Sequence, residues 1–417
     1  MSDTPPVEVE VHLADLLAAT HRLPAVTVPL AAALGRVLAT DVVAVQPVPR
    51  FDNSAMDGYA VRRADVIGAS EADPVALDVI GEVAAGSADD PPLFPGQAVR
   101  IMTGAALPTA ADAVVPVEHT AGYRASRAWA EVGASVEVVV PAVAGAHVRR
   151  AGEDLSVGDL VLPAGVVLTP FRLGAAAAAG VGEVEVVRAP RVAVVATGDE
   201  LVPPGTVPAR GQIPESNSVL LAAAVARAGG EVVSVARVGD DPADLLAHLD
   251  RLATERSPDL VVCTGGVSVG AHDVVKAALT GRGVTFRGVA MQPGKPQAFG
   301  RLDSGALCVG LPGNPVSVAV SFEVFVRPAL QAMQGLAPVG AARTEAEVAD
   351  GWRSPPGRRQ FMPIAFGADG RIRRATGGGS GSHLAGGLAQ AEGFAIVAAE
   401  ASEVSPGDRL PVMLVES

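Results

Sequence analysis

The sequence predicts a multidomain α/β protein, with a central doubly wound α/β domain, smaller mixed or β domains and a C-terminal β-barrel. The chain has 417 residues, of which 49% are hydrophobic, so it can bury more than one core at the usual size of about 150 residues per domain. From Val192 to Leu330, short β-branched runs alternate with helical segments, which is typical of a parallel sheet covered on both faces. After about Leu336 the chain turns to short strands separated by Gly and Pro, which favours a small β-barrel.

The central domain has the clearest pattern of elements. Its strands are short apolar runs rich in β-branched residues. They are predicted at Arg191 to Ala196, Glu231 to Val238, Asp259 to Thr264, around Val284 to Met291, and Ala306 to Leu311. The helices between and after them are predicted at Ser218 to Arg227, from Asp241 onward, at Asp273 to Leu279, and from Asn314 until Pro328.

The ends of these helices carry residues that commonly cap helices. Asn217 is expected to cap the first helix and Gly229 to stop it. Asp241 and Asn314 occupy N-cap positions, and a proline suited to the first helical turn follows each of them. Pro328 is expected to end the last helix, because proline removes a helical hydrogen bond.

The residues before Val192 are rich in Pro, Gly and β-branched types, which indicates smaller mixed or β domains. Helices are predicted near Val9 to Ala19 and from Pro170 to Ala179, and strands in Ala98 to Pro108 and Ser135 to Val143.

Charge and cysteine content disfavour several function classes. The formal net charge of −13 argues against nucleic acid and anionic membrane as partners, so an anionic ligand needs local donors. The two cysteines, Cys263 and Cys308, lie in apolar runs that predict buried strands, which argues against a disulfide framework and for the cytoplasm. The N-terminal segment shows no basic region followed by an apolar stretch, and no apolar run reaches about 18 residues without Gly, Pro or charge. Secretion and membrane insertion are therefore not expected.

Glycine-rich polar motifs follow the predicted strands of the central domain. In an open doubly wound sheet, ligands bind outside the carboxyl ends of the strands. Five strand ends combine glycine with an acid, a hydroxyl or a lysine, so these motifs should meet in one polar pocket. They are TGDEL (197–201), GDDP (239–242), TGGVSVGAHD (264–273), QPGKP (292–296) and LPGNP (311–315).

The residue types in this pocket suit a nucleotide or pyrophosphate. Glycines permit tight turns, and serine and backbone amides can donate to a phosphate. Lys295 adds a positive charge for the same anion. Ligand binding is predicted for Thr197, Gly198, Gly265, Gly266, Ser268, Gly270, Gly294, Pro312, Gly313 and Asn314.

Carboxylates in the same motifs predict a magnesium site. Oxygen donors are the ligands that Mg²⁺ prefers when it bridges phosphates, and acids that only cap helices are the alternative. Capping is the favoured role of Asp241 and Asn314, whereas Glu200, Asp273 and Lys295 are predicted to be functional. The predicted metal ligands are Asp199, Glu200, Asp240 and Asp273.

A second polar cluster lies far away along the sequence, in PRFDNSAMDGYAVR (49–62). A DG pair alone also suits a simple turn. Thr103 ends a predicted strand in the same region, and RRAGED (149–154) offers two arginines suited to bidentate anion contact or to a solvated loop. The polar side chains of the first segment are Asp52, Asn53, Ser54 and Asp57.

Seven motifs in a fixed order span nearly the whole chain: FDNSAMDGYAV, RIMTGA, RRAGED, ATGDEL, TGGVSVG, PGKP and GLPGNPVS. With these motifs the sequence resembles the MoeA and gephyrin E-domain family of molybdopterin molybdenumtransferases. The resemblance implies an enzyme that inserts molybdate into adenylated molybdopterin and releases AMP, a late step of molybdenum cofactor biosynthesis. It also implies a need for Mg²⁺ or a similar divalent cation, and an elongated cytoplasmic homodimer. Molybdopterin adenylyltransferase and molybdoenzyme apoproteins are the other partners to expect.

The family resemblance implies four domains. The third resembles the enzyme that adenylates molybdopterin, and the active cleft lies between subunits. The predicted division is domain I, 1–46 with 146–189; domain II, 47–145; domain III, 190–332; and domain IV, 333–417.

Family site residues carry over by motif. Asp57 and Thr103 of domain II are expected to face domain III of the other subunit. Asp154 and Ser382 match further positions around that cleft. Together with the first pair, the catalytic residues implied are Glu200, Asp240, Asp273 and Lys295.

The sequence departs from the family pattern at Gln292 and Gly288, where many relatives carry lysine. Arg287 or Arg149 could replace the lost charge, or molybdate affinity could be weaker. Two other readings of the motifs are a molybdopterin adenylyltransferase-like activity and a non-catalytic cofactor-binding or scaffold paralogue.

Overall fold

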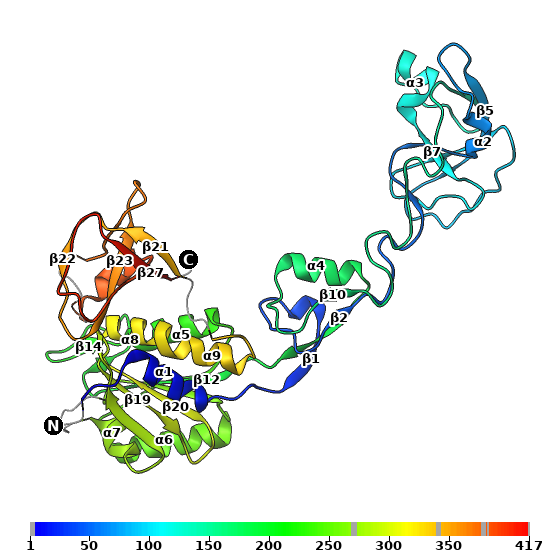
Figure 1. The fold of residues 1–417 in the computed structure, drawn as a ribbon. Coiled ribbons are helices and arrows are strands. Elements are labelled where there is room, and N and C mark those ends of the chain that lie inside the picture. Colours follow the sequence, from blue (N-terminus) through cyan, green and yellow to red (C-terminus); the bar gives the residue numbers. More distant parts are fainter. Residues whose placement is uncertain (1–4, 268–272, 339–342, 377–380, 382, 416–417) are drawn as a thin grey trace.

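The structure of the protein is a computed structural model. It describes residues 5–267, 273–338, 343–376, 381 and 383–415. A central α/β domain and a C-terminal β domain form one end, and two smaller units extend away from them (Figure 1). We call this extension, residues 25–187, the arm. The structure confirms the predicted multidomain α/β fold class.

The central domain is built on a six-stranded sheet with the order β15-β12-β16-β20-β19-β17. Strands β15, β12, β16 and β20 pair in parallel, as the alternation of strands and helices predicts. The observed bounds are β12 Arg191–Thr197, β15 Glu231–Val238, β16 Leu260–Thr264, β17 Val284–Gly288, β19 Pro296–Arg301 and β20 Leu307–Leu311.

Helices cover both faces of this sheet (Figure 1). On one face, Leu221 and Val225 of α5 and Val318 of α8 join the largest hydrophobic core. On the other face, Leu245 of α6 and Val275 of α7 join a second core. The bounds are α5 Asn217–Arg227, α6 Pro242–Glu255, α7 Val274–Leu279 and α8 Pro315–Ser321.

One strand of the sheet was not predicted. The segment of β19 contains glutamine, glycine and arginine and lacks β-branched residues, so its sequence gives a weak strand signal. It runs antiparallel to both β17 and β20. Its first residues therefore lie at the edge where the parallel strands end, and this brings Lys295, which directly precedes β19, to that edge.

The last helix of the central domain continues beyond its predicted end at Pro328. Helix α8 passes into a π-helix, η3 Phe322–Val326, and then into α9 Arg327–Met333. A π-helical turn already replaces the usual i to i−4 hydrogen bonds, so the proline that follows it does not break the rod. By length and composition the helical rod 315–333 could cross a membrane, but 83% of it is buried inside the described structure, as in a core helix.

The predicted helix caps are partly confirmed. The Asp241 side chain accepts a hydrogen bond from the Ala243 amide at 2.8 Å, as expected. Asn314 occupies the N-cap position of α8 but its side chain makes no capping hydrogen bond. The prediction for Asn217 is wrong, because this residue is the first of α5 and Glu215 accepts from the backbone amide of Ser218 instead, at 2.9 Å.

The N-terminal helix packs on the central domain rather than on the arm (Figure 1). This helix, α1 Val9–Ala18, places buried His12 between the rings of Phe299 and Phe325. The Nε atom of Arg287 donates to His12 Nδ1 at 2.9 Å. Burial, followed by the neighbouring Arg287 charge, lowers the pKa of His12 to about 3.

The part of the arm next to the central domain consists of two short antiparallel ladders and one helix. Strand β1 pairs with β11, and β2 pairs with β10. The alanine-rich helix is present, and its N-cap Thr169 accepts from the Arg172 amide at 3.5 Å. The bounds are β1 Ala25–Pro29, η1 Leu30–Ala32, β2 Val42–Val43, β10 Leu160–Leu162, α4 Pro170–Ala178 and β11 Glu183–Val187.

The far part of the arm is a five-stranded sheet with the order β7-β4-β6-β5-β8. The strand predicted from Ala98 covers Gln97–Ile101, and that predicted from Ser135 ends at Val138. The bounds are β3 Asn53–Ser54, β4 Gly58–Val61, α2 Arg63–Val66, β5 Val75–Val83, β6 Gln97–Ile101, β7 Ala113–Pro116, η2 Val117–His119, α3 Ala121–Ser126, β8 Ser135–Val138 and β9 Val148–Arg149.

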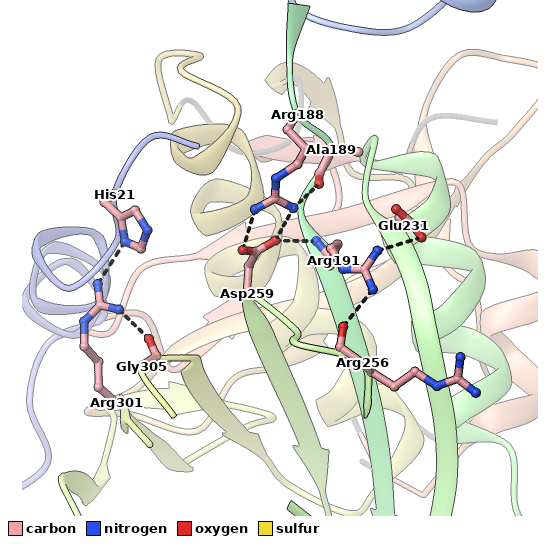
Figure 2. Close-up of polar contacts among 9 residues, drawn as sticks. All are labelled: His21, Arg188, Ala189, Arg191, Glu231, Arg256, Asp259, Arg301 and Gly305. Atoms are coloured by element: carbon pink, nitrogen blue, oxygen red, sulfur yellow. Dashed lines mark hydrogen bonds and ion pairs between the residues drawn. The ribbon is translucent and has the colours of Figure 1, made fainter. Parts of the chain in front are cut away.

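Polar contacts fix the neck, the two chain segments 19–24 and 188–190 that join the arm to the central domain (Figure 2). Arg188 donates to both carboxylate oxygens of Asp259, at 2.8 and 2.7 Å. The same carboxylate accepts from the Arg191 amide at 2.8 Å. On the other segment, Nη2 of Arg301 lies 3.1 Å from Nδ1 of His21.

The C-terminal domain is a β domain whose strands follow the path β18-β23-β25-β27-β21, with β24 paired to β23. Val348, directly after β21, forms a parallel bridge with Ile372 of β24. The strand path therefore closes on itself, as in the predicted barrel. The bounds are β18 Met291–Gln292, β21 Arg343–Glu347, β22 Trp352–Arg353, β23 Arg359–Phe366, β24 Ile372–Arg374, η4 Ala385–Gln390, β25 Gly393–Val397, β26 Glu403–Val404 and β27 Arg409–Leu414.

Candidate functional site

A cavity of about 540 Å³ opens at the carboxyl ends of the parallel strands. This is the position at which doubly wound sheets bind ligands. Residues that follow β12, β15, β16 and β20 all contribute to it, so the structure brings nine of the predicted site residues together here. The predicted residues that line this rim cavity are Thr197, Gly198, Glu200, Asp240, Gly265, Gly266, Asp273, Gly313 and Asn314.

The turn after β12 places Glu200 at the cavity. Gly198 adopts a φ of +146°, and a Cβ atom built there would lie 2.4 Å from Oε2 of Glu200. Glycine is therefore needed for the carboxylate to fold back over the turn. Glu200 is exposed, so it can meet a ligand.

Asp199 and Asp240 tie the ends of β12 and β15 together. The Asp199 amide donates to Oδ2 of Asp240 at 3.3 Å, and the Asp240 amide donates to Oδ1 of Asp199 at 3.2 Å. Asp240 lines the rim cavity and Asp199 does not. Through these two hydrogen bonds, Asp199 lies beside the cavity and holds Asp240 in place.

Two buried acceptors lie in the wall of the rim cavity. Oδ2 of Asp273 and Oδ1 of Asn217 have no hydrogen-bond partner within the described part of the chain. The amide nitrogen of Asn217 is fixed, because it donates to the Gly313 carbonyl at 2.6 Å and to the Thr264 hydroxyl at 3.1 Å. Buried unpaired acceptors are costly, and a donor or a cation in the cavity would satisfy them.

The glycines that predict close turns are needed sterically. Gly265 has a φ of +89°, and a Cβ atom there would lie 2.7 Å from the Thr197 carbonyl oxygen. Gly266 has a φ of +63°, and its Cβ atom would lie 3.0 Å from the Val275 amide nitrogen. Both glycines line the rim cavity, so a side chain at either position would strain its wall.

A second cavity, of about 350 Å³, shares Gly266, Gly313 and Asn314 with the first. We call it the lysine cavity, because Lys295 lines it together with Gly294, Pro312 and Ser317. Its wall includes Gln292, whose side-chain oxygen accepts from Nη1 of Arg358 at 3.3 Å. A positive side chain from the C-terminal domain therefore lies beside Gln292, one of the two positions where the resemblance led us to expect lysine.

Arg287 and Arg149, the two arginines considered as substitutes for that lysine, lie elsewhere. The Arg287 guanidinium faces α1, where it forms an ion pair with Asp15 at 2.8 Å and lies over the ring of Phe299. Arg149 belongs to β9 in the far part of the arm. Neither lines the lysine cavity.

The predicted metal ligands do not form a protein-only metal site. In the described ranges, no group of three or more His, Cys, Asp and Glu side chains is arranged to hold a metal ion. Glu200, Asp240 and Asp273 nevertheless line one cavity. Such an arrangement suits an ion that keeps several waters and shares phosphate oxygens, which is how magnesium is commonly bound.

The second predicted cluster lies in the far part of the arm. Asp57 precedes β4, and its Oδ1 accepts from the Thr103 amide at 2.8 Å and from the Thr103 hydroxyl at 2.7 Å. The amide and then the hydroxyl lower the pKa of Asp57. Within one chain this sheet lies at the opposite end from the central domain (Figure 1), so a single subunit does not bring the two clusters together.

The RRAGED motif supports the same cluster. Arg150 forms an ion pair with Asp52 at 2.5 Å, and the Ala151 amide donates to Asp52 at 2.8 Å. This amide and then Arg150 lower the pKa of Asp52. Asp154 is exposed, and its amide donates to the Val48 carbonyl.

Comparisons with known proteins bear on the whole chain. Three domain families match it: "MoeA N-terminal region (domain I and II)" over residues 7–180, "Probable molybdopterin binding domain" over 193–332, and "MoeA C-terminal region (domain IV)" over 345–415. Molybdopterin molybdenumtransferase 2 of Mycobacterium tuberculosis is 46% identical over 93% of this chain and 94% of the relative. This chain belongs to the molybdopterin molybdenumtransferase family.

Other relatives of the molybdopterin molybdenumtransferase family agree in sequence and fold. The enzyme of Haemophilus influenzae is 34% identical over 91% of this chain and 91% of its own length. A crystal structure of the molybdopterin biosynthesis MoeA protein from Pyrococcus horikoshii covers 99% of this chain and 100% of its own, at 28% identity and a TM-score of 0.78.

The predicted and the observed site residues of this family member differ in two ways. Ser268, Gly270 and Ser382 were predicted and fall outside the described residues. The rim cavity is also lined by residues that were not predicted as ligands, and Arg358 lies beside the lysine cavity. The polar pair Ser216 and Asn217 could have been predicted from the sequence. Residues of η4 and Arg358 could not, because packing between segments far apart in sequence places them at the site. These unpredicted lining residues include Glu215, Ser216, Asn217, Pro315, His383 and Ala385.

Proposed function

We propose that this protein inserts molybdate into adenylated molybdopterin and releases AMP, a late step of molybdenum cofactor biosynthesis. One observation carries the proposal: an acid-lined cavity and a lysine-lined cavity share a wall of Gly266, Gly313 and Asn314. A substrate that joins a nucleotide phosphate to a metal oxyanion needs both environments side by side. The membership of the chain in the molybdopterin molybdenumtransferase family supports it.

The acids of the rim cavity suit the phosphate side of the reaction. Glu200, Asp240 and Asp273 would hold a Mg²⁺ ion against the phosphates, and the bound ion would offset their negative charge. The unpaired buried oxygen of Asp273 fits this role, and also fits the orientation of the water or molybdate oxygen that attacks the phosphoanhydride. The attacking oxygen bonds to the phosphorus on the pterin side as the bridging P–O bond breaks, and AMP leaves with the bridging oxygen.

The lysine cavity suits the oxyanion. Molybdate carries two negative charges and is repelled by unneutralised carboxylates, whereas Lys295 and the neighbouring Arg358 offer positive charge. The substrate itself brings the dithiolene sulfurs, which replace two molybdate oxygens, and these oxygens leave as water with protons from the thiols and the solvent. No nucleophilic cysteine or serine is therefore required of the protein.

We also propose that the functional unit is a cytoplasmic homodimer. Asp57 and Thr103 share the implied site with Glu200 and Asp273, yet lie at the far end of the same chain from them (Figure 1). The arm of a second copy would supply this pair. Cys263 and Cys308 are buried and free, which agrees with a reducing compartment.

The test is to mix the purified protein with adenylated molybdopterin, molybdate and Mg²⁺. The proposal expects AMP release that requires all three components, together with molybdenum bound to the pterin product. In a parallel assay with molybdopterin, ATP and Mg²⁺, formation of adenylated molybdopterin would instead show an adenylyltransferase. Tight binding of the adenylated pterin without AMP release would show a non-catalytic paralogue.

A further inference from the structure

The turn that carries Lys295 is held by a buried glutamine. Gln297, the second residue of β19, is 0% exposed. Its amide nitrogen donates to the carbonyl oxygen of Gly294 at 2.7 Å and to the hydroxyl of Ser321 at 2.7 Å. The side chain thus connects the residue before Lys295 to helix α8.

The direction of this amide is fixed. The Gly294 carbonyl can only accept, so the amide nitrogen and not the oxygen of Gln297 must face it. Oε1 of Gln297 is consequently buried without a hydrogen-bond partner among the described residues. An unpaired buried oxygen costs stability, whereas an apolar side chain of the same shape would avoid that cost. The hydrogen bond that Gln297 donates to the Gly294 carbonyl therefore explains why glutamine stands here.

The turn is held on its other sides as well. Gly294 has a φ of +103°, and a Cβ atom there would lie 3.1 Å from the Ser321 hydroxyl and 3.1 Å from Cε of Met291. The Lys295 carbonyl accepts from the Val289 amide at 2.7 Å. Hydrogen bonds hold the backbone on both sides of the Lys295 Cα atom. The position of this Cα atom is therefore fixed, although the residue itself is exposed.

We infer that Gln297 is a positioning residue for the oxyanion: it fixes the Gly294–Lys295 turn, from which Lys295 lines the lysine cavity. This inference rests on the proposed function, because it takes molybdate as the occupant of that cavity. Gln297 does not line the cavity, so it acts only through Lys295.

The test uses the full-length protein and molybdate alone, with affinity measured by titration calorimetry and folding checked by thermal melting. Gln297→Met removes the donor and keeps the side-chain shape. We expect molybdate affinity to fall about tenfold, which corresponds to about 1.4 kcal/mol. Ser321→Ala, which leaves the Gly294 contact in place, should reduce affinity less than Gln297→Met does.

A double-mutant cycle separates positioning from general loosening. In a Lys295→Ala background, Gln297→Met should change molybdate affinity less than about twofold. The matched control is Gln334→Met, because the buried Gln334 also donates to two backbone carbonyls, of Ala228 and Leu330, at 2.9 and 3.0 Å. That variant should lose stability and keep its molybdate affinity.

Three results would overturn the inference. Gln297→Met could bind molybdate like wild type, could weaken binding equally with and without Lys295, or could weaken it no more than Gln334→Met does. A Lys295→Ala variant with wild-type affinity would refute the proposed occupant of the lysine cavity itself, and this role of Gln297 with it.

Discussion

Asp57 and Thr103 are joined by two hydrogen bonds in the far part of the arm. A single carboxylate oxygen of Asp57 accepts both the amide and the hydroxyl of Thr103, at 2.8 and 2.7 Å. These two bonds lower the pKa of Asp57, so the carboxylate stays charged well below neutral pH. The Asp57 carboxylate is therefore negatively charged and held in one orientation. In the proposed homodimer this pair faces the central domain of the other subunit.

A heterodimer tests this arrangement. Asp57→Asn and Asp273→Asn should each inactivate the homodimer. A co-expressed heterodimer with one variant in each subunit, purified through two different tags, contains one doubly altered site and one unaltered site if sites form between subunits. We expect it to recover about half of the wild-type AMP release. No recovery would show that the two residues act within one chain or not at all.

His12 predicts a pH dependence of stability. Its pKa is lowered to about 3 by burial and then by Arg287, with Asp15 acting in the opposite direction. Between this value and the usual pKa of about 6.5, the unfolded chain binds a proton that the folded protein does not. Stability should therefore fall as pH is lowered from 6.5, by up to about 1.4 kcal/mol per pH unit.

The measurement is the melting temperature of wild type and His12→Gln between pH 6.5 and 4.5. The variant lacks the titrating group, so its melting temperature should fall less steeply. Parallel curves for the two proteins would contradict the buried neutral imidazole.

The Arg188–Asp259 pair predicts a strong effect at the neck (Figure 2). The side chains of Arg188 and Asp259 are 29% and 15% exposed, so their charges are partly desolvated. Asp259→Asn should lower the free energy of unfolding by about 1–3 kcal/mol, because Arg188 keeps its charge without a carboxylate. In the same figure Arg191 pairs with Glu231, whose side chain is 56% exposed, and Glu231→Gln should cost less than about 1 kcal/mol.

Urea unfolding of the two variants checks this prediction. Equal losses in Asp259→Asn and Glu231→Gln would show that the neck carboxylate is no more important than a surface charge.

Gly265 predicts a steric effect at the rim cavity. Gly265→Ala adds backbone strain at a φ of +89° and a 2.7 Å contact with the Thr197 carbonyl. Gly305→Ala is a matched control, since its φ is +86° and a Cβ atom there meets nothing within 4 Å. We expect a cost of about 1 kcal/mol for the control and about 1–3 kcal/mol more for Gly265→Ala, with loss of AMP release only in the latter. Similar melting temperatures for both variants would refute the close approach of Gly265 to the Thr197 carbonyl.

Local signals in the sequence were enough for most of the central domain. Strand β15 has the predicted bounds, and Asp241 caps α6 through its side chain, because both depend on residues close in sequence. The glycine and acid motifs identify the rim cavity, since the carboxyl ends of parallel strands meet at one edge of a sheet.

Features set by distant residues were not predictable in this way. Pro328 continues a helix because a π-helical turn precedes it, and β19 exists because β17 and β20 flank it. Asn217 turns its amide to Gly313 instead of capping α5. Arg358, from another domain, donates to Gln292 in the wall of the lysine cavity.

The most direct test of the central claim, that the acids of the rim cavity cleave the phosphoanhydride when molybdenum is inserted, compares Asp273→Asn with Asp241→Asn. Asp241 only caps α6, and asparagine caps a helix equally well, so this control should release AMP at close to the wild-type rate. Asp273→Asn should slow AMP release and molybdenum incorporation by at least about 100-fold, at an unchanged melting temperature. Wild-type rates in Asp273→Asn would contradict the claim.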